Sequence, residues 1–565
     1  MIYTITCNPS IDYVVKLPAL KIGELNRSIE DDAYVAGKGV NVSYVLKTLG
    51  YNSKALGFAA GFTGKYLVDK LNEDGIDNDF VMISNGMTRI NVKASGDSET
   101  EINGTGPFVG EDDFKALLNK LNDLDANDIV IISGSVCQGL DEHAYEKIMA
   151  YLYDKRCKVV VDATGKLLLN TLKYRPFLVK PNIDELGELF NTKINKEDVV
   201  IYARKLKELG AVNVLVSMGK DGALLVNEYD RAHTIGSAIG TLVNSVGAGD
   251  SMVAGFIAKY LQTHVYKEAL LFASSVAAAT AFSKRMASID MINSIYDQMY
   301  KLWGKHKRYF FFDIDGTLTD RKTHQVVDSA LVAIKKLQEA NHFVAIATGR
   351  AAYKAMGFMQ SVDIHNMVCS GGKGIVLNDD LVENKPLDRD KALAIIKQAD
   401  SLGYGLLLML DDSRCVYAKN DLFVKQAGYR KEPTDYIYDA ALDYDKLKDI
   451  YKIYISIPEA EEDRLTLKDT LGNLRFEKEY LMFQYDCKDE GIIRMMEYLG
   501  HDIKDVVTFG DDSNDLVMFK DEWCNIAVGN ATDDLKARAT YVTDANVDNG
   551  IYNVCSKFGW FEKVD

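Results

Sequence analysis

Two carboxylates stand two residues apart at the end of an aromatic, strand-like run in YFFFDIDGTLTD (309–320). Residues i and i+2 of a strand point to the same side, so the side chains of Asp313 and Asp315 can lie close together. Two carboxylates at that distance repel each other unless a cation lies between them or they share a proton. A Mg²⁺ ion that they hold together with a third carboxylate would supply the cation. The pair therefore indicates a Mg²⁺ site at a strand end.

Later segments offer the groups that such a site needs. Four polar residues follow another strand-like run in VVTFGDDSNDLVMF: Asp511, Asp512, Asn514 and Asp515. Thr348 follows the run in AIATGR and offers a hydroxyl to a phosphate oxygen, while Lys488 offers positive charge. Each piece has a structural alternative, because aspartate-rich loops often cap helices and a single lysine usually faces solvent. Their order after successive strands favours a phosphate-handling site.

A different arrangement of small residues and one carboxylate occurs in NSVGAGDSMVAGF (244–256). Gly247, Ala248 and Gly249 precede a helical apolar pattern, and such small residues let the amides of a helix N-terminus converge on an anion. Asp250, beside this anion hole, could take a proton from an attacking hydroxyl, and a well-placed general base contributes about 10²–10⁴-fold. The alternative interpretation is a glycine-rich turn that enters a core helix.

Three other segments could help to bind phosphate or nucleotide. AGKGVNVSYVLKTLG places four residues at a loop-to-helix junction: Gly37, Lys38, Gly39 and Asn41. KPNIDEL gives Asn182 and Glu185 a spacing suited to holding Mg²⁺ through water. VSMGKDGALLV is predicted to be a strand, a glycine-rich turn and a second strand, which could cradle a nucleotide or form a plain hairpin. The chain has no G-x-x-x-x-G-K-[ST] motif, which excludes a P-loop enzyme.

Composition narrows the possible functions. The 565 residues carry a formal net charge of −16, which argues against a nucleic-acid backbone as the main partner. The eight cysteines are scattered without a C-x-x-C pair, and with no signal peptide this favours a reducing cytoplasm. The most apolar run, LLFASSVAAATAF near 270–282, is too short to span a bilayer and predicts a buried helix, so no membrane partner is expected.

The positions of strands and helices predict the organisation. Short apolar runs alternate with helical patterns almost throughout, which predicts α/β units whose parallel sheets lie between helices. The helical pattern MINSIYDQMYKLW ends before a glycine and four basic residues, so the predicted parts are 1–303, a solvated linker at 304–308, and 309–565.

Two regions depart from this alternation of strands and helices. Period-two strands at about 11–36 and 88–104 predict a small antiparallel lid sheet, and the strand-rich stretch at about 373–485 predicts an inserted cap.

Residues 1–300 resemble the ribokinase-like (pfkB) family of carbohydrate kinases, most closely its 1-phosphofructokinases and the related tagatose-6-phosphate kinases. The resemblance is carried by the ordered set TCNPSIDY, AGKGVNVSYVLKTLG, GFAAGFTG, SGSVCQGL, LVKPNIDEL and NSVGAGDSMVAGF. The resemblance implies a ribokinase-like α/β sandwich with a β lid, often shared across a homodimer. It also implies transfer of the ATP γ-phosphate to fructose 1-phosphate with Asp250 as base, and an anion hole at residues 247–250. Asp12 and Asn41 would hold sugar hydroxyls. Lys38, Arg89 and Arg27, with Gly37 and Gly39, would meet the sugar's phosphate. The implied ATP-binding residues are Lys180, Asn182, Glu185, Ser217, Gly219 and Gly222.

The motifs of residues 309–565 are similar to those of the haloacid dehalogenase-like phosphatases, specifically the Cof-type branch with a large cap. This resemblance implies a Rossmann-like core with an inserted α/β cap, and Asp313 as the nucleophile that forms an aspartyl-phosphate. Asp315 would act as general acid and then base. Thr348 and Lys488 would hold the phosphoryl group, and Mg²⁺ would be bound by Asp313, Asp315 and Asp511. Behind them lie Asp512, Asn514 and Asp515.

Three functions fit these features. The first is a bifunctional enzyme that makes one phosphate ester with ATP and hydrolyses another. The second is a kinase whose C-terminal half only senses a phosphorylated metabolite, although a sensor has no need of a nucleophile such as Asp313. The third makes the N-terminal half a tagatose-6-phosphate kinase. The expected small-molecule partners are sugar phosphates and ATP.

Overall fold

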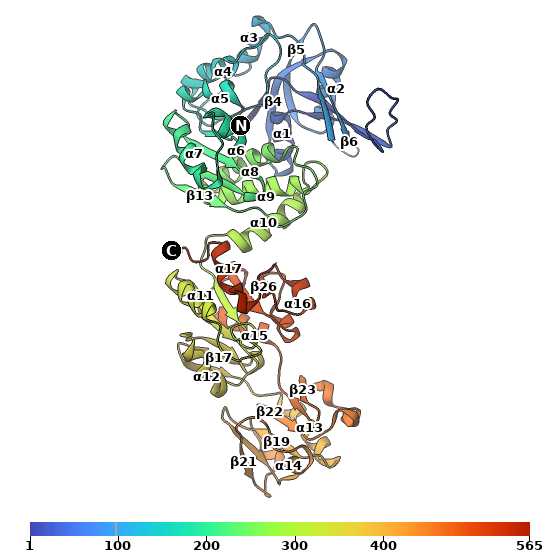
Figure 1. The fold of residues 1–565 in the computed structure, drawn as a ribbon, viewed down its shortest axis with the longest axis vertical. Coiled ribbons are helices and arrows are strands. Elements are labelled where there is room, and N and C mark those ends of the chain that lie inside the picture. The colour runs from blue at the N-terminus through green and yellow to red at the C-terminus, as the bar shows by residue number, and fades with distance from the viewer. Residues whose placement is uncertain (96–98, 565) are drawn as a thin grey trace. The chain divides into compact units, whose positions relative to one another are not determined.

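The computed structural model describes residues 1–95 and 99–564 and divides the chain into two compact units, Met1–Trp303 and Gly304–Asp565. Residues 96–98, which fall within the expected lid segment, lie outside the described residues. Both units are α/β, which confirms the predicted fold class (Figure 1). Among the described residues, no helix has both the length and the apolarity needed to cross a bilayer.

The first unit is built on a nine-stranded sheet. Its order is β13 (Ala232–Ile235), β12 (Ala223–Val226), β11 (Asn213–Ser217), β10 (Leu178–Val179), β9 (Lys158–Asp162), β8 (Ile129–Ser133), β1 (Ile2–Thr6), β4 (Ser53–Ala60) and β5 (Asp77–Ile83). The strands from β11 to β5 are parallel, whereas β12 and β13 join by antiparallel pairing. All five residues of β8 are buried, as expected for a central parallel strand with helices on both faces.

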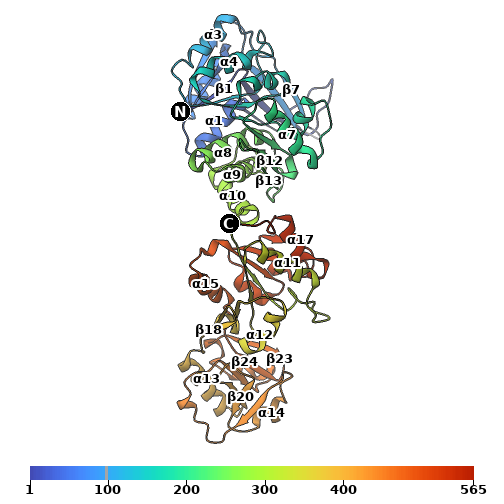
Figure 2. The same cartoon turned by 90° about the vertical axis from the view of Figure 1, so that its left-hand side faces the viewer.

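Helices cover both faces of this sheet (Figures 1 and 2). They are α1 (Lys38–Thr48), α2 (Gly61–Glu73), α3 (Glu111–Asn119), α4 (Ala144–Leu152), α5 (Gly165–Leu169), α6 (Ile183–Leu189), α7 (Val199–Glu208), α8 (Ala248–Thr263), α9 (Tyr266–Ala281) and α10 (Ile289–Trp303). Alternate residues of β8 enter two separate cores: Val130 and Ile132 enter one, and Ile129 and Ile131 the other. The apolar run near 270–282 forms the buried helix α9, as predicted.

A separate four-stranded sheet corresponds to the expected lid strands. Its order is β3 (Glu30–Ala36), β2 (Ser10–Lys16), β6 (Arg89–Ser95) and β7 (Glu99–Asn103). The expected antiparallel pairing is found for β2 with β3 and for β6 with β7, whereas β2 and β6 pair in parallel. Between them the chain runs through β4, α2 and β5, and such a crossover is what a parallel pair requires.

The core of the second unit is an eight-stranded sheet. Its order is β18 (Asp380–Asn384), β17 (Gly374–Leu377), β16 (Met367–Cys369), β15 (Phe343–Ala347), β14 (Tyr309–Phe312), β25 (Val506–Gly510), β26 (Cys524–Ala527) and β27 (Tyr541–Val542). Its helices are α11 (Asp328–Glu339), α12 (Ala352–Ser361), α15 (Lys488–Leu499), α16 (Asp533–Arg538) and α17 (Gly550–Lys557). The strands β15, β14 and β25 are adjacent and parallel, so the motifs that follow them meet at one edge of the sheet.

The cap is a six-stranded sheet with two helices. The strands are β21 (Asp435–Tyr438), β20 (Cys415–Ala418), β19 (Leu406–Met409), β22 (Lys452–Ile455), β24 (Tyr480–Phe483) and β23 (Asn473–Glu477), and the helices are α13 (Arg389–Ser401) and α14 (Leu422–Ala427). The predicted start of the cap at 373 is too early, because β17 and β18 extend the core sheet. A hairpin has the same alternation whichever sheet it joins, so the sequence pattern cannot distinguish the two.

The expected solvated linker at 304–308 also needs correction. The side chain of Arg308 is buried with 1% exposure, and its Nη2 donates to the Gly304 carbonyl at 2.8 Å. Its guanidinium lies 5.3 Å from the ring centre of Trp560. A basic residue beside the start of a strand is expected to be solvated. The planar guanidinium of Arg308 instead stacks on the aromatic ring of Trp560 in the same unit.

Candidate functional sites

The predicted kinase residues come together around one cavity of about 850 Å³ in the first unit. The predicted residues that line it are Asp12, Gly37, Lys38, Asn41, Arg89, Lys180, Asn182, Glu185, Ser217, Gly219, Gly222, Gly247, Ala248, Gly249 and Asp250. Arg27 and Gly39 are not among the described lining residues. Arg27 is exposed in the loop between β2 and β3. Gly39 lets α1 approach β1, since a Cβ there would lie 2.5 Å from Thr6 Oγ1.

Asp250 is a buried carboxylate in the first turn of α8, with 5% exposure. Asn41 Nδ2 donates to its Oδ2 at 2.7 Å. Burial, and then the charge of Asp162, raise the pKa of Asp250 to about 7. A carboxylate with that proton affinity at the wall of a cavity is suited to accept a proton from a hydroxyl near neutral pH.

The loop before α8 has the backbone shape of an anion-binding turn. Gly247 caps the helix with φ of 80°, a left-handed backbone conformation that favours glycine. The amide of Ala248 donates to the Ser245 carbonyl at 3.3 Å, so it is already engaged. The next amides belong to the first helical turn, where no carbonyl of the helix can accept from them. They can therefore serve an anion, with the help of the helix dipole.

One end of the cavity is formed by lid residues. Asp12 on β2 is buried, and its Oδ1 accepts from Ser10 Oγ at 2.7 Å and from Asn91 Nδ2 at 3.0 Å. Lys93 Nζ lies 3.0 Å from Asp12 Oδ2. Arg89, the first residue of β6, donates from Nε to the Asn8 carbonyl at 3.2 Å, which orients its guanidinium at the cavity. The sequence analysis did not single out Asn91 and Lys93, although the alternation of TRINVKAS could have placed them on the same side of the strand.

A second buried carboxylate organises the lysines of the site. Asp162, the last residue of β9, lies 3.3 Å from Lys38 Nζ and 3.4 Å from Lys180 Nζ. Its exposure is 1%, and its position at the end of the apolar strand in KVVVDA is the sequence signal that was overlooked. Because one carboxylate faces two ammonium groups, this part of the cavity retains positive charge that suits a phosphate.

The segment expected to hold Mg²⁺ through water forms a helix cap in the structure. Asn182 Oδ1 accepts from the Glu185 amide at 2.8 Å, and Glu185 Oε2 accepts from the Asn182 amide at 2.8 Å. This reciprocal capping box begins α6. Ser217 ends β11, and Gly219 and Gly222 form the turn before β12, as the strand–turn–strand pattern predicts.

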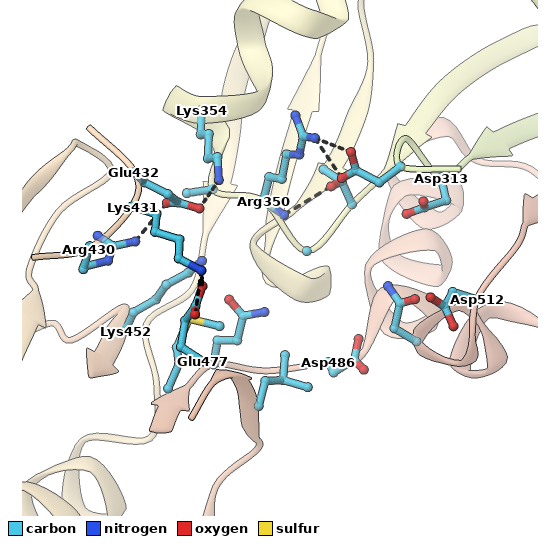
Figure 3. Close-up of a pocket in the computed structure, with 18 of the residues that line it drawn as sticks. Asp313, Arg350, Lys354, Arg430, Lys431, Glu432, Lys452, Glu477, Asp486 and Asp512 are labelled. Atoms are coloured by element: carbon cyan, nitrogen blue, oxygen red, sulfur yellow. Dashed lines mark hydrogen bonds and ion pairs between the residues drawn. The ribbon is translucent and has the colours of Figure 1, made fainter. Parts of the chain in front are cut away.

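In the second unit, a cavity of about 770 Å³ is lined by both core and cap residues (Figure 3). Asp313 lies directly after β14 and is 6% exposed. Lys488, the first residue of α15, donates from Nζ to Asp313 Oδ1 at 2.8 Å and to Asp515 Oδ1 at 2.6 Å. Burial, and then the charge of Asp515, raise the pKa of Asp313 to about 7, while the Lys488 ammonium opposes that rise.

Asp315 does not join Asp313 as the spacing predicts. Its carboxylate accepts from Arg350 Nη2 at 2.6 and 2.8 Å, and its side chain is 60% exposed. The chain turns directly after β14, so the two-residue strand alternation no longer applies at this position. Arg350, which follows Thr348 in AIATGR, was overlooked because its partner is 35 residues away.

The predicted metal ligands are Asp313, Asp315 and Asp511, but the carboxylates that gather are Asp313, Asp511 and Asp515, whose oxygens all lie within 4.8 Å of one another. Asp515 is occupied by Lys488 and by the amides of Asp511 and Asp512. Burial raises the pKa of Asp511 to about 6, although a hydroxyl and a guanidinium donate to its carboxylate. A hard dication suits such a donor set, so the residues fit Mg²⁺, with Asp313 and Asp511 as the carboxylates that would hold it.

The remaining predicted phosphatase residues lie around the same site. Thr348 follows β15 and lines the cavity, and its Oγ1 accepts from the Arg350 amide at 3.2 Å. Asp512 caps the short 3₁₀ helix Ser513–Met518, and Asn514 lines the cavity. Arg321, which was not predicted, donates from Nε to Asp511 at 2.8 Å and from Nη2 to Asp512 at 2.6 Å.

Comparisons with known proteins agree with this division. The family model for pfkB carbohydrate kinases matches residues 2–290, and the model for haloacid dehalogenase-like hydrolases matches residues 310–555. A 1-phosphofructokinase of Bacillus subtilis is 43% identical over 300 residues, covering 53% of this chain and 98% of that protein. A D-tagatose-1-phosphate kinase of Bacillus licheniformis is 35% identical over 303 residues, covering 53% and 98%.

A solved structure is also similar in fold. The tetrameric inhibited form of phosphofructokinase-2 from Escherichia coli has a TM-score of 0.50 and 26% identity, covering 53% of this chain and 98% of that chain. The chain therefore belongs to the pfkB family of carbohydrate kinases and carries, in its second unit, an enzyme domain of the haloacid dehalogenase-like hydrolases.

Proposed function

We propose that the first unit transfers the γ-phosphate of ATP to the 6-hydroxyl of fructose 1-phosphate. The observation that carries this proposal is Asp250, buried at the cavity wall beside the N-terminus of α8. The hydroxyl proton passes to Asp250 as the oxygen attacks the γ-phosphorus, and the bond to the β,γ-bridging oxygen breaks to give ADP. Lys38 and Arg89 supply cationic donors for the phosphate already on the sugar, which a kinase of free sugars would not need.

Tagatose phosphates are the competing acceptors. The relatives include a 1-phosphofructokinase at 43% and a D-tagatose-1-phosphate kinase at 35% identity, so the higher identity favours fructose 1-phosphate. The test is ADP formation measured side by side with fructose 1-phosphate, tagatose 1-phosphate and tagatose 6-phosphate. A kcat/KM for either tagatose ester above that for fructose 1-phosphate would reassign the substrate.

We propose that the second unit hydrolyses a phosphate monoester through an aspartyl-phosphate. Asp313 attacks the phosphorus, the ester bond breaks, and Asp315 gives the leaving oxygen a proton. Water then attacks the acyl-phosphate, returns a proton to Asp315 and releases inorganic phosphate. Bound Mg²⁺ would supply positive charge to the carboxylates and the phosphoryl oxygens. Lys488 holds Asp313 in place, and a substrate that draws Arg350 away would free Asp315.

The kinase-plus-sensor alternative is weaker than the phosphatase proposal. Asp313, Lys488 and Asp515 form a buried, hydrogen-bonded chain, and binding alone does not require an ionic triad of this kind. The test is phosphate release from a panel of sugar phosphates by Asp250→Ala protein, in which the kinase is silent. Adding Asp313→Asn to that protein should remove the release, and release that persists would reject Asp313 as nucleophile.

We further propose a homodimer formed through the lid sheet. Apolar side chains are exposed on the loop between β2 and β3 and on β7: Ile22 is 96% exposed, Leu25 76%, Ile29 65% and Ile102 65%. A patch of this kind on a soluble enzyme commonly marks an interface. Sedimentation should give a dimer for the wild type and a monomer for Ile22→Asp/Leu25→Asp, and an unchanged mass would reject this interface.

A further inference from the structure

The cap end of the phosphatase cavity carries an unusual number of basic side chains. Six charged residues lie there: Lys354, Arg430, Lys431, Lys452, Glu432 and Glu477. Figure 3 shows this group on the opposite side of the pocket from Asp313 and Asp512. Four cations against two carboxylates leave a local charge of +2, in a chain whose formal net charge is −16.

Three of these cations already have carboxylate partners. Glu432 pairs with Lys354 and accepts from Arg430 Nη2 at 2.9 Å. Lys431 Nζ lies 2.8 Å from Glu477. The guanidinium of Arg430 also lies 4.2 Å from the ring centre of Tyr454, which fixes its position. These ion pairs involve both carboxylates at the cap end of the pocket.

Lys452 is the fourth cation, and neither Glu432 nor Glu477 forms an ion pair with it. Among the described residues, no carboxylate oxygen lies within 4.0 Å of its Nζ. Burial lowers the pKa of Lys452 to about 8, and the charge of Glu432 opposes this shift without reversing it. Lys452 is half-buried and has no direct ion pair with any described residue, so an anionic ligand in contact with its ammonium group would offset the cost of its burial.

The sheet register explains why this lysine faces the cavity. Lys452 begins β22 opposite Met409 of β19, and Lys452 and Tyr454 share one face because side chains alternate along a strand. Met409, Tyr454 and Met482 line the same cavity, whereas Ile453 and Ile455 enter the separate core against α13. Lys452 is thus fixed on a rigid strand rather than on a mobile loop.

We propose that the second unit selects phosphate monoesters that carry a second anionic group, a phosphate or a carboxylate, which Lys452 binds at the cap end of the pocket while Asp313 receives the phosphate to be cleaved. This inference rests on the proposed phosphatase activity and names its substrate class. A cavity of about 770 Å³ is within the roughly 300–1,000 Å³ range of small-molecule sites and leaves room beyond a single phosphoryl group.

The test uses full-length Asp250→Ala protein and two matched substrate pairs. Fructose 1-phosphate against fructose 1,6-bisphosphate adds a phosphate, and glycerol 3-phosphate against 3-phosphoglycerate adds a carboxylate. The kcat/KM for phosphate release should be about tenfold or more higher for the doubly anionic member of at least one pair, since a charge-assisted hydrogen bond contributes that much. The pair that responds identifies the second group.

A substitution at the proposed subsite then tests the residue. Lys452→Met should lower the preference ratio about tenfold or more, and Lys452→Arg should restore most of it. The matched control is Lys446→Met, which removes a cap lysine whose side chain is 84% exposed and pairs with Asp443, and it should leave the ratio unchanged.

The outcomes separate the two proposals. If esters are hydrolysed with dependence on Asp313 but neither pair shows more than a twofold preference, the inference is overturned and the phosphatase stands. The same holds if Lys452→Met keeps the wild-type ratio. If no ester is hydrolysed with dependence on Asp313, the phosphatase proposal and this inference fail together. The comparison within each pair needs no variant at position 452, so a misfolded Lys452→Met would not obscure it.

Discussion

Each unit has a buried aspartate that we propose as its reactive group, Asp250 in the first and Asp313 in the second, and the two differ in which group donates a hydrogen bond to the carboxylate. Asp250 and Asp313 both have their pKa raised to about 7, in both cases chiefly by burial. Asp250 lies at a helix N-terminus, and its hydrogen-bond donor is the neutral amide of Asn41. Asp313 lies at the end of a parallel strand, and its donor is the ammonium of Lys488.

This difference fits the two proposed roles, Asp250 as base and Asp313 as nucleophile. A neutral donor leaves the proton affinity of Asp250 high, which suits a group that must take a proton. An ammonium at 2.8 Å favours the ionised form of Asp313, which suits a group that must attack phosphorus and must not be protonated. Asp250 and Asp313 therefore have similarly raised pKa values but suit different chemistry, because their hydrogen-bond donors differ in charge.

The largest expected effect comes from Asp313→Asn. The amide is nearly isosteric but cannot form an acyl-phosphate, so phosphatase kcat should fall by more than about 10³-fold. ATP-dependent formation of fructose 1,6-bisphosphate should stay within twofold of wild type. Both rates are measured on the same preparation, and a parallel loss of kinase activity would show that the two sites are not independent.

Asp250→Ala is the reciprocal change. Removing the general base should lower kinase kcat by about 10²–10⁴-fold, while phosphatase turnover persists. Coupled detection of ADP measures the first rate and phosphate release the second. If the variant keeps more than about a tenth of wild-type kinase kcat, Asp250 is not the base.

Charge reversal at the lid end of the kinase cavity should act on binding. Arg89→Glu replaces attraction by repulsion, so KM for fructose 1-phosphate should rise about 10- to 100-fold, with a much smaller change in KM for ATP. Lys115→Glu, at a lysine whose side chain is 65% exposed on α3, is the control and should change neither KM. An equal rise in both KM values would remove Arg89 from the acceptor site.

The dependence of kinase kcat/KM on pH is the smallest expected effect, and it tests the assignment of Asp250 as the base. Because Asp250 acts deprotonated and its pKa is about 7, kinase kcat/KM should fall about tenfold per unit as the pH drops below 7. Asp162→Asn removes a charge that raises the pKa of Asp250, so the acid limb should move to lower pH. A limb that stays in place, or moves upward, would contradict the electrostatic assignment.

Sequence reasoning succeeded where chemistry follows a strand or helix end. Thr348, Asp511 and Asp250 could be located because parallel strands and helix N-termini expose their ends to a common site. The fold class followed from the alternation of short apolar runs with helical patterns, and the buried helix α9 from an apolar run too short to span a bilayer.

The sequence predictions failed where the role of a residue depends on contacts with residues that are distant in the sequence. Asp162 matters because Lys38 and Lys180 reach it across the sheet, and Asp315 is displaced by its pairing with Arg350. The role of Lys452 depends on which strands flank β22. A local pattern predicts which face of a strand a residue lies on. The order of strands in the sheet then decides which residues it contacts there.

The measurement that tests the two-enzyme account most directly is phosphorus NMR of full-length protein supplied with fructose 1-phosphate, ATP and Mg²⁺. The account holds that the first unit makes fructose 1,6-bisphosphate and that the second does not efficiently remove its 6-phosphate, since that would restore the acceptor and waste ATP. If so, fructose 1-phosphate is consumed in proportion to the ADP formed, equally in wild type and Asp313→Asn, and no sugar bisphosphate forms in Asp250→Ala. Continued ATP consumption with fructose 1-phosphate unchanged and inorganic phosphate rising, abolished by Asp313→Asn, would contradict it.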